Sequence, residues 1–270
     1  MSAFRRFFLA LLPLTAMVLL SLAGCGAQMS GQMNTGQTAA AAILPESETA
    51  EKATAAVFAM DTIITLEAYG GMADQAVLEA ESQIKQLENL WSVTDENSEI
   101  YRANHSQGQP VKISPSTEYL IDYALKMAEE TEGRLNPAIY PVLCAWGFTT
   151  KQYRVPEADE LEELLKHTDY RQIQIKNGFL TIPAGMEIDL GAVAKGYAGD
   201  LLRETLTEKG IRSTIVNLGG NVNLIGSSKD GKHWKVGIRS PYGDGNIGVL
   251  EGRFELNAAS RGIPVYTIDR

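Results

Sequence analysis

In several segments of the chain, hydrophobic residues recur at steps of three or four, which is the spacing of one buried helix face. The clearest stripe predicts a long helix and comprises Val77, Ala80, Ile84, Leu87 and Trp91. Further helices are expected after Ser114-Pro115-Ser116, from Pro156, and from about Ala192 to Lys209, where Gly210 ends the pattern.

Other segments are rich in β-branched residues or alternate apolar with polar positions, which predicts strands. They cover residues 62–69, 173–176, 179–182, 186–190, 214–218, 222–225 and 234–238. Asn177-Gly178 lies between two alternating runs and predicts a two-residue hairpin turn. Because helices come first and mostly antiparallel strands come later, the expected fold class is α+β, in a single domain with N-terminal helices and a mostly antiparallel sheet.

The N-terminus has the pattern of a bacterial export signal. Arg5 and Arg6 precede an apolar run over 7–22 and the small residues before Cys25. That run of roughly 16 residues is shorter than the ~20 that a transmembrane helix needs. The ending Leu22-Ala23-Gly24-Cys25 resembles a lipobox, in which the cysteine carries lipid such as palmitate.

We therefore expect a lipoprotein signal peptide over 1–24, a lipidated Cys25 with a flexible tether over 25–56, and a folded domain over 57–270. The expected location is the cell membrane, on its extracytoplasmic face. The net charge of −9 argues against nucleic acid as a partner and against attraction to anionic lipid, so lipid is expected to hold the protein at the membrane. With Cys25 lipidated, Cys144 has no partner for an intramolecular disulfide.

The strongest candidate for a binding site is the stretch over 189–196, where a predicted strand enters a helix. A helix N-terminus presents free backbone N–H groups and a partial positive charge, which suits phosphate. Gly191 lets a ligand approach the backbone, and Lys195 adds a positive charge. Asp189 suits a ribose hydroxyl, an amino group or a metal-bound water. A structural role, with Asp189 capping the helix and Lys195 in solvent, explains the same pattern.

Two further segments allow either a structural or a functional interpretation. Asn217-Leu218-Gly219-Gly220-Asn221 suits a hairpin turn, but its glycines also allow a ligand to approach the backbone. The segment 133–148 contains aromatic residues that are typical of a core but also suit a pocket for a flavin or adenine ring. The histidines are scattered, which argues against a His-based zinc site; they are His105, His167 and His233.

Taken in order, these segments resemble the ApbE-type FAD:protein FMN transferases over roughly residues 57–250. Residues 189–200 are similar to the family's Asp-Leu-Gly-[Gly/Ala]-x-Ala-Lys-Gly-[Tyr/Phe]-Ala-x-Asp motif, and 217–221 to its Asn-Leu-Gly-Gly-[Asp/Asn] turn. The other segments that carry the resemblance are 58–62, 91–100, 133–148 and 234–241.

The resemblance implies that FMN is transferred from FAD to a Thr or Ser hydroxyl of a target protein, in a Mg²⁺-dependent phosphoryl-transfer reaction that releases AMP. The acceptor it implies is a membrane redox subunit that carries the flavinylation site. Carried over by position, the residues that contact FAD are Met60, Arg134, Leu135, Asn136, Asp189 and Lys195. The backbone carbonyl of Ala192 is implied as one Mg²⁺ ligand, and oxygen ligands suit this ion.

The chain departs from the family pattern at several positions. Asp61 replaces the usual glycine, Thr94 stands where some members carry a flavin-contacting tyrosine, and Asn136 stands where aspartate is common. The family continues with a His-x-[Ile/Leu]-[Asp/Asn]-Pro loop and an Asp-Ala-x-[Ser/Thr]-Thr segment that adds Mg²⁺ ligands, and neither precedes the last residue, Arg270. We therefore expect the C-terminal part of the family domain to be missing. The alternatives are a truncated, inactive FAD-binding lipoprotein, an FAD pyrophosphatase that uses water in place of the acceptor, and a solute-binding lipoprotein of unrelated fold.

Overall fold

The computed structural model describes residues 51–252, all within one structural unit of the chain. The predicted signal peptide, the lipidation site at Cys25 and most of the predicted tether lie outside the described residues, as does the segment 253–270. Within 51–252, every helix is too short or too polar to cross a lipid bilayer.

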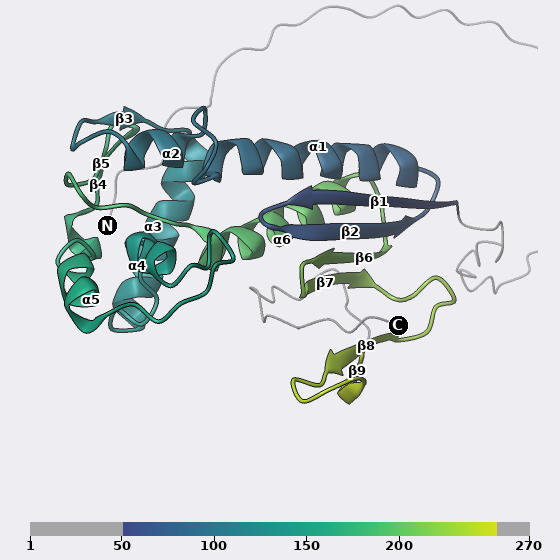
Figure 1. The fold of residues 1–270 in the computed structure, drawn as a ribbon. Coiled ribbons are helices and arrows are strands. Elements are labelled where there is room, and N and C mark those ends of the chain that lie inside the picture. Colours follow the sequence, from purple (N-terminus) through teal and green to yellow (C-terminus); the bar gives the residue numbers. More distant parts are fainter. Residues whose placement is uncertain (1–50, 253–270) are drawn as a thin grey trace, which may run out of the picture. The chain divides into compact units, whose positions relative to one another are not determined.

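The strands of the described region form three antiparallel sheets (Figure 1). A four-stranded sheet has the order β1-β2-β6-β7, a three-stranded sheet has the order β3-β5-β4, and β8 pairs with β9. The strands are β1 Lys52–Ala59, β2 Thr62–Tyr69, β3 Val111–Lys112, β4 Gln174–Lys176, β5 Phe179–Thr181, β6 Ser213–Leu218, β7 Asn221–Gly226, β8 Trp234–Arg239 and β9 Asn246–Gly252.

Two long helices cover one face of the four-stranded sheet (Figure 1). The predicted stripe of α1 is buried, and α1 packs against β1 and β2, while α6 packs against α1 and β7. The helices are α1 Ala73–Trp91, α2 Glu99–Asn104, α3 Pro115–Glu130, α4 Tyr140–Ala145, α5 Ala158–Leu165, the short 3₁₀ helix η1 Tyr170–Gln172, and α6 Gly191–Glu208. The helices and antiparallel sheets confirm the predicted α+β class.

Local sequence signals set the ends of these elements. The Ser114 hydroxyl accepts a hydrogen bond from the Thr117 N–H at the start of α3, with Pro115 in the first helical position. After α6, Gly210 takes a positive φ of 76°, and the Ile211 N–H donates to the Leu206 carbonyl, which closes the helix as predicted.

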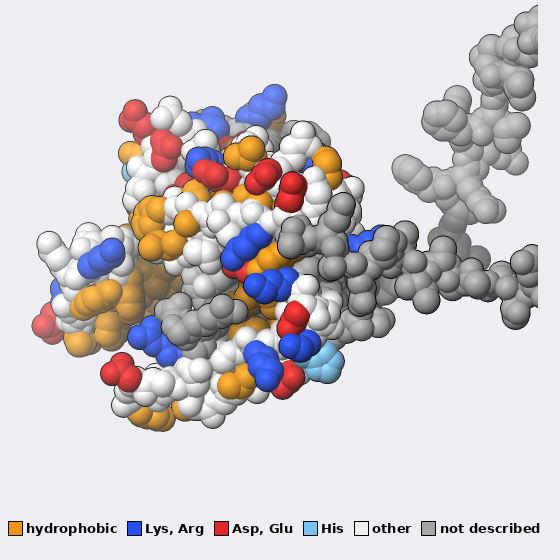
Figure 2. Space-filling model, turned by 90° about the vertical axis from the view of Figure 1, so that its right-hand side faces the viewer, with side chains coloured by type: hydrophobic (Ala, Val, Ile, Leu, Met, Phe, Trp, Pro, Cys, Tyr) orange, Lys and Arg blue, Asp and Glu red, His pale blue; other side chains and the backbone are white. Residues whose placement is uncertain are grey.

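The β4–β5 hairpin forms at the predicted turn. Asn177 and Gly178 have φ angles of 54° and 76°, which fit a two-residue turn whose twist matches that of the strands. The β8–β9 hairpin exposes Ile247 and Val249, and hydrophobic side chains are visible at the bottom of Figure 2, where this hairpin lies.

The structure differs from the sequence predictions most clearly in two places, beyond shifts of one or two residues at the ends of other elements. First, β1 begins at Lys52, so residues 52–56, which the sequence assigned to the tether, lie in a strand that pairs with β2. Second, residues 186–190 are not a strand. Ile188 and Leu190 are buried as a strand would bury them, but the backbone of Ile188 pairs with the side chain of Asn104 instead of a neighbouring strand.

Candidate functional site

The turn between β1 and β2 carries Met60, the first predicted FAD contact. Met60 and Asp61 both have positive φ angles, 51° and 56°, as a tight turn between twisted strands requires. Aspartate tolerates this conformation better than most residues, which explains how Asp61 can replace glycine here. The Met60 N–H donates to Oε2 of Glu88 on α1 at 2.6 Å, so the helix holds the turn in place.

The Gly219-Gly220 turn lies beside the β1–β2 turn. In the register of β2 with β6, Ile64 is opposite Leu218, which brings both turns to the same end of the sheet. Gly219 has a φ of 65°, and a side chain there would overlap Thr62, the first residue of β2. The hairpin interpretation of this segment is therefore confirmed, and its glycine also permits close packing of the two turns.

The first two residues of α6 are exposed in the described part of the chain. Leu190 occupies the N-cap position without a capping side chain, and Gly191 and Ala192 are exposed. Oδ1 of Asp189 accepts a hydrogen bond from the Gly191 N–H at 2.9 Å, so the structural role for this carboxylate is present. That bond occupies one carboxylate oxygen and the Gly191 N–H, and the Val193 N–H donates to the Leu190 carbonyl. The Ala192 N–H and the second carboxylate oxygen are left for a ligand.

Two distant segments hold Asp189 in position. The Asp189 N–H donates to the carbonyl of Pro137 at 2.8 Å, which ties the stretch just before α6 to the predicted segment 133–148. One residue earlier, the buried Asn104 side chain bonds both backbone groups of Ile188. Asp189 therefore sits on a backbone that is fixed from two sides, as a ligand-orienting residue requires.

The surroundings of Asp189 act on its pKa in both directions. Burial disfavours the carboxylate and raises the pKa of Asp189 above its ordinary value. The Gly191 N–H and the positive charge of Lys195 lower this pKa, while the negative charge of Asp61 raises it. Within the described region no ion pair joins Lys195 to an acidic side chain, so its charge is available to an anionic ligand.

The three predicted FAD contacts at 134–136 have different environments in the structure. The Arg134 side chain is 76% exposed and bonds to the Thr131 carbonyl and the Glu132 carboxylate on its own turn. Leu135 packs against the core. Asn136 uses both ends of its amide within the protein, donating to the Thr168 carbonyl and accepting from the Ala138 N–H. The structure thus joins this stretch to Asp189 through Pro137, and it does not bring the Arg134 guanidinium there.

The aromatic segment that follows is partly core and partly surface. Tyr140 is buried, and burial raises the pKa of its hydroxyl, with further contributions from Cys144, Glu187 and Asp189. Phe148, in contrast, is exposed and makes an edge-on contact with Tyr153. The segment therefore contacts Asp189 through the Pro137 carbonyl, while Phe148 lies on the surface of the described region.

Sequence reasoning missed two residues that shape the site, Glu88 and Asn104. Glu88 is a half-buried acidic residue at the flank of the apolar stripe of α1, and Asn104 is the last residue of the short helix α2. Each binds a backbone group far away in the sequence, so no local spacing marks them.

The match to a family model covers every element of this site. The model of the ApbE family matches residues 60–260, from the β1–β2 turn to beyond β9. The chain belongs to the ApbE family.

Among similar proteins, one from Treponema pallidum (strain Nichols), named FAD:protein FMN transferase, is 32% identical over 187 residues, which is 63% of this chain and 52% of that protein. A protein of the same name from Klebsiella pneumoniae (strain 342) is 31% identical over 182 residues, covering 66% of this chain and 55% of that protein. This ApbE-family chain thus spans about half the length of the curated relatives it matches.

Solved structures of ApbE proteins have the same fold. The crystal structure of the ApbE protein from Thermotoga maritima superposes with a TM-score of 0.69 at 29% identity, covering 75% of this chain and 68% of that one. The flavin transferase ApbE from Vibrio cholerae superposes with a TM-score of 0.65 at 26% identity, covering 71% of this chain and 65% of that one.

Proposed function

We propose that this chain belongs to an FAD:protein FMN transferase and supplies the part of that enzyme that binds FAD. The single observation that carries the proposal is the exposed N-terminus of α6, with Lys195 unpaired among the described residues and Asp189 held beside it. The names of the relatives and the resemblance of residues 189–200 and 217–221 to the family's motifs support FAD as the ligand.

The chain's own groups suit the parts of FAD. The free N–H group of Ala192 and the charge of Lys195 attract the pyrophosphate. The second carboxylate oxygen of Asp189 can accept a hydrogen bond from a hydroxyl or an N–H of the ligand. Met60, on the β1–β2 turn that Glu88 holds, offers an apolar surface to a flat ring.

Mg²⁺ fits this arrangement when it is shared with phosphate. Among residues 51–252, no three acidic, histidine or cysteine side chains gather into a metal site. Mg²⁺ at phosphoryl-transfer sites, however, is usually held by one or two carboxylates together with phosphate oxygens and water. Asp189 and the carbonyl of the exposed Ala192 are the groups that we propose as its protein ligands. When bound, the ion neutralises negative charge on the pyrophosphate.

The proposed reaction moves the FMN phosphoryl group from AMP to a protein hydroxyl. The oxygen of an acceptor Thr or Ser forms a bond to the FMN phosphorus and its hydroxyl proton passes to solvent, while the phosphoanhydride bond breaks and AMP leaves with the electron pair. Such a transfer depends mainly on positioning and on neutralising charge, which helix N–H groups and a lysine can provide. We further propose that lipid on Cys25 anchors the protein to the extracytoplasmic face of the membrane, where a membrane redox subunit would be the acceptor.

Gel fluorescence tests the transfer. The protein is incubated with FAD, MgCl₂ and an acceptor protein, and flavin fluorescence is read on the denatured acceptor band, with the Treponema pallidum relative as a positive control. Our proposal predicts a labelled acceptor band and an equal amount of released AMP. An unlabelled band beside a labelled one for the relative contradicts it. Release of AMP and FMN without labelling identifies the FAD pyrophosphatase alternative.

A further inference from the structure

The outer face of the three-stranded sheet carries a row of three side chains, with a phenylalanine between two lysines. In the registers of β3 with β5 and of β4 with β5, both Lys112 and Lys176 lie directly opposite Phe179. Residues directly opposite each other point to the same face of a sheet. Phe179 is 42% exposed, and both lysines are exposed, so the row faces solvent.

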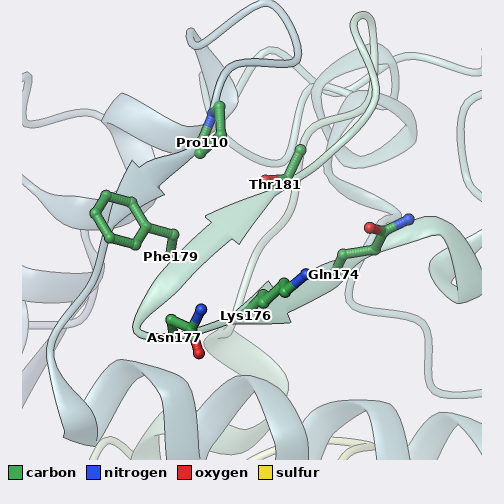
Figure 3. Close-up of a pocket in the computed structure, with 6 residues that line it drawn as sticks. All are labelled: Pro110, Gln174, Lys176, Asn177, Phe179 and Thr181. Carbon is green, nitrogen blue, oxygen red and sulfur yellow. The ribbon is translucent and has the colours of Figure 1, made fainter.

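A hollow of about 430 Å³ opens beside this row. Figure 3 shows its lining, in which Phe179 and Thr181 come from β5, Gln174 and Lys176 come from β4, and Asn177 lies in the turn between the strands. Pro110 adds a second apolar side chain to the lining, near Thr181. The hollow thus combines an apolar wall with side chains that donate and accept hydrogen bonds.

The charge of the row is not compensated within the described structure. Across residues 51–252, neither Lys112 nor Lys176 forms an ion pair with an acidic side chain, although the chain as a whole has a net charge of −9. Most other exposed lysines and arginines of this region are paired, for example Lys85 with Glu81 and Arg154 with Glu160. Two unpaired cations around an exposed aromatic ring therefore form a local site for negative charge.

We propose that this basic–aromatic row and the hollow beside it bind an acidic segment of a partner protein. One apolar side chain of that segment packs on Phe179 and Pro110 in the hollow, and flanking carboxylates pair with Lys112 and Lys176. Because β4 is an edge strand of its sheet, an extended segment can also pair with its backbone. The hydrogen-bonding side chains of Gln174, Asn177 and Thr181 in this open hollow favour a peptide as the occupant, because a peptide backbone offers matching donors and acceptors.

Fluorescence anisotropy with a labelled peptide tests this proposal independently of FAD. The probe carries glutamates on both sides of a central leucine, and a matched peptide carries glutamines instead. We expect the glutamate peptide to bind at low salt, and each of the changes Lys112→Gln and Lys176→Gln to weaken binding roughly fivefold. The change Phe179→Ser should weaken the binding of both peptides. Thermal unfolding confirms that each variant is folded.

The control is a double variant at two exposed lysines outside the row, Lys151→Gln and Lys229→Gln, which should leave binding unchanged. Equal binding by the wild-type protein and the Lys112→Gln, Lys176→Gln double variant overturns the proposal, as does the absence of binding by the wild type. Vesicles containing phosphatidylserine test the alternative occupant, a membrane surface. Loss of vesicle binding in this double variant, with no peptide binding by the wild type, would identify the row as a membrane contact.

Discussion

The side-chain amide of Asn104 bonds to both backbone groups of Ile188. Its Nδ2 donates to the Ile188 carbonyl at 2.9 Å, and its Oδ1 accepts from the Ile188 N–H at 2.8 Å, with all of these groups buried. The amide thereby replaces the neighbouring strand that residues 186–190 lack. Because Asp189 follows directly, this pair of bonds fixes the backbone from which the candidate site is built.

Replacing this amide should destabilise the protein and weaken the site together. The change Asn104→Ala leaves two buried backbone groups without partners, and we expect a loss of about 2–4 kcal/mol in the free energy of unfolding. Urea denaturation measures it, and an FAD titration of the folded variant measures the effect on the site. Asn97→Ala is the control, because the Asn97 side chain makes an exposed bond to Asp95. Equal stability of the two variants would contradict the role of Asn104.

Two glycines of α6 should respond in opposite ways to alanine. A methyl group at Gly199 would overlap the Asn223 side chain of β7, whereas at Gly196 it meets open space. We expect Gly199→Ala to cost about 1–3 kcal/mol of stability through overpacking. Gly196→Ala should gain up to about 1 kcal/mol, because alanine favours the helix. Chemical denaturation of both variants measures the difference, and a loss of stability for Gly196→Ala would argue against the packing described for α6.

The pKa of Asp189 should shift in opposite directions when its two charged neighbours are neutralised. Lys195→Gln removes a charge that lowers the pKa, so the pKa should rise further, while Asp61→Asn removes one that raises it, so the pKa should fall. A ¹³C NMR titration of the carboxyl group measures both shifts. Unchanged values in both variants would show that neither charge lies near Asp189.

The same raised pKa gives a dependence of stability on pH. Because the pKa of Asp189 is higher in the folded state than in the unfolded state, the carboxyl group lowers stability as the pH rises from the unfolded pKa through the folded one. Asp189→Asn should therefore flatten the fall in unfolding free energy over that window. An unaltered pH profile would contradict the assignment.

The bond between Glu88 and the Met60 N–H should matter more for FAD binding than for catalysis. Glu88→Ala removes a bond to a charged acceptor, which is worth roughly 1.5–3 kcal/mol, and frees the strained β1–β2 turn. We expect weaker FAD binding, seen as a higher KM with a smaller change in kcat. Glu81→Ala on the same helix, which loses an exposed ion pair with Lys85, is the control. A fall in kcat at constant KM would contradict a positioning role.

Much of the fold was predictable because its signals are local. The apolar stripe of α1, the glycine that closes α6 and the Asn177-Gly178 turn each specify their element through neighbouring residues. Residues 186–190 could not be assigned in the same way, because alternation of buried side chains looks like a strand whether the backbone partner is a strand or Asn104. That partner lies 84 positions away in the sequence.

The candidate site shows the same division. One short motif contains Asp189, Gly191 and Lys195. The structure places all three at the start of α6, with the charge of Lys195 acting on Asp189. Glu88 escaped prediction because an acidic residue on an amphipathic helix looks solvated, and its bond to Met60 spans 28 positions. The FAD contact of Arg134 stays a prediction, and in the structure its side chain bonds to its own turn.

An FAD titration of the wild-type protein and the Lys195→Gln variant, followed by quenching of flavin fluorescence, tests the central claim most directly. Our account predicts saturable binding by the wild type and binding weakened about tenfold or more by Lys195→Gln, since a charge-assisted contact with phosphate is lost. The control variant Lys85→Gln, at an exposed position on α1, should bind FAD with the same affinity as the wild type. Equal FAD affinity of the Lys195→Gln variant and the wild type would contradict the assignment of the FAD site to the N-terminus of α6.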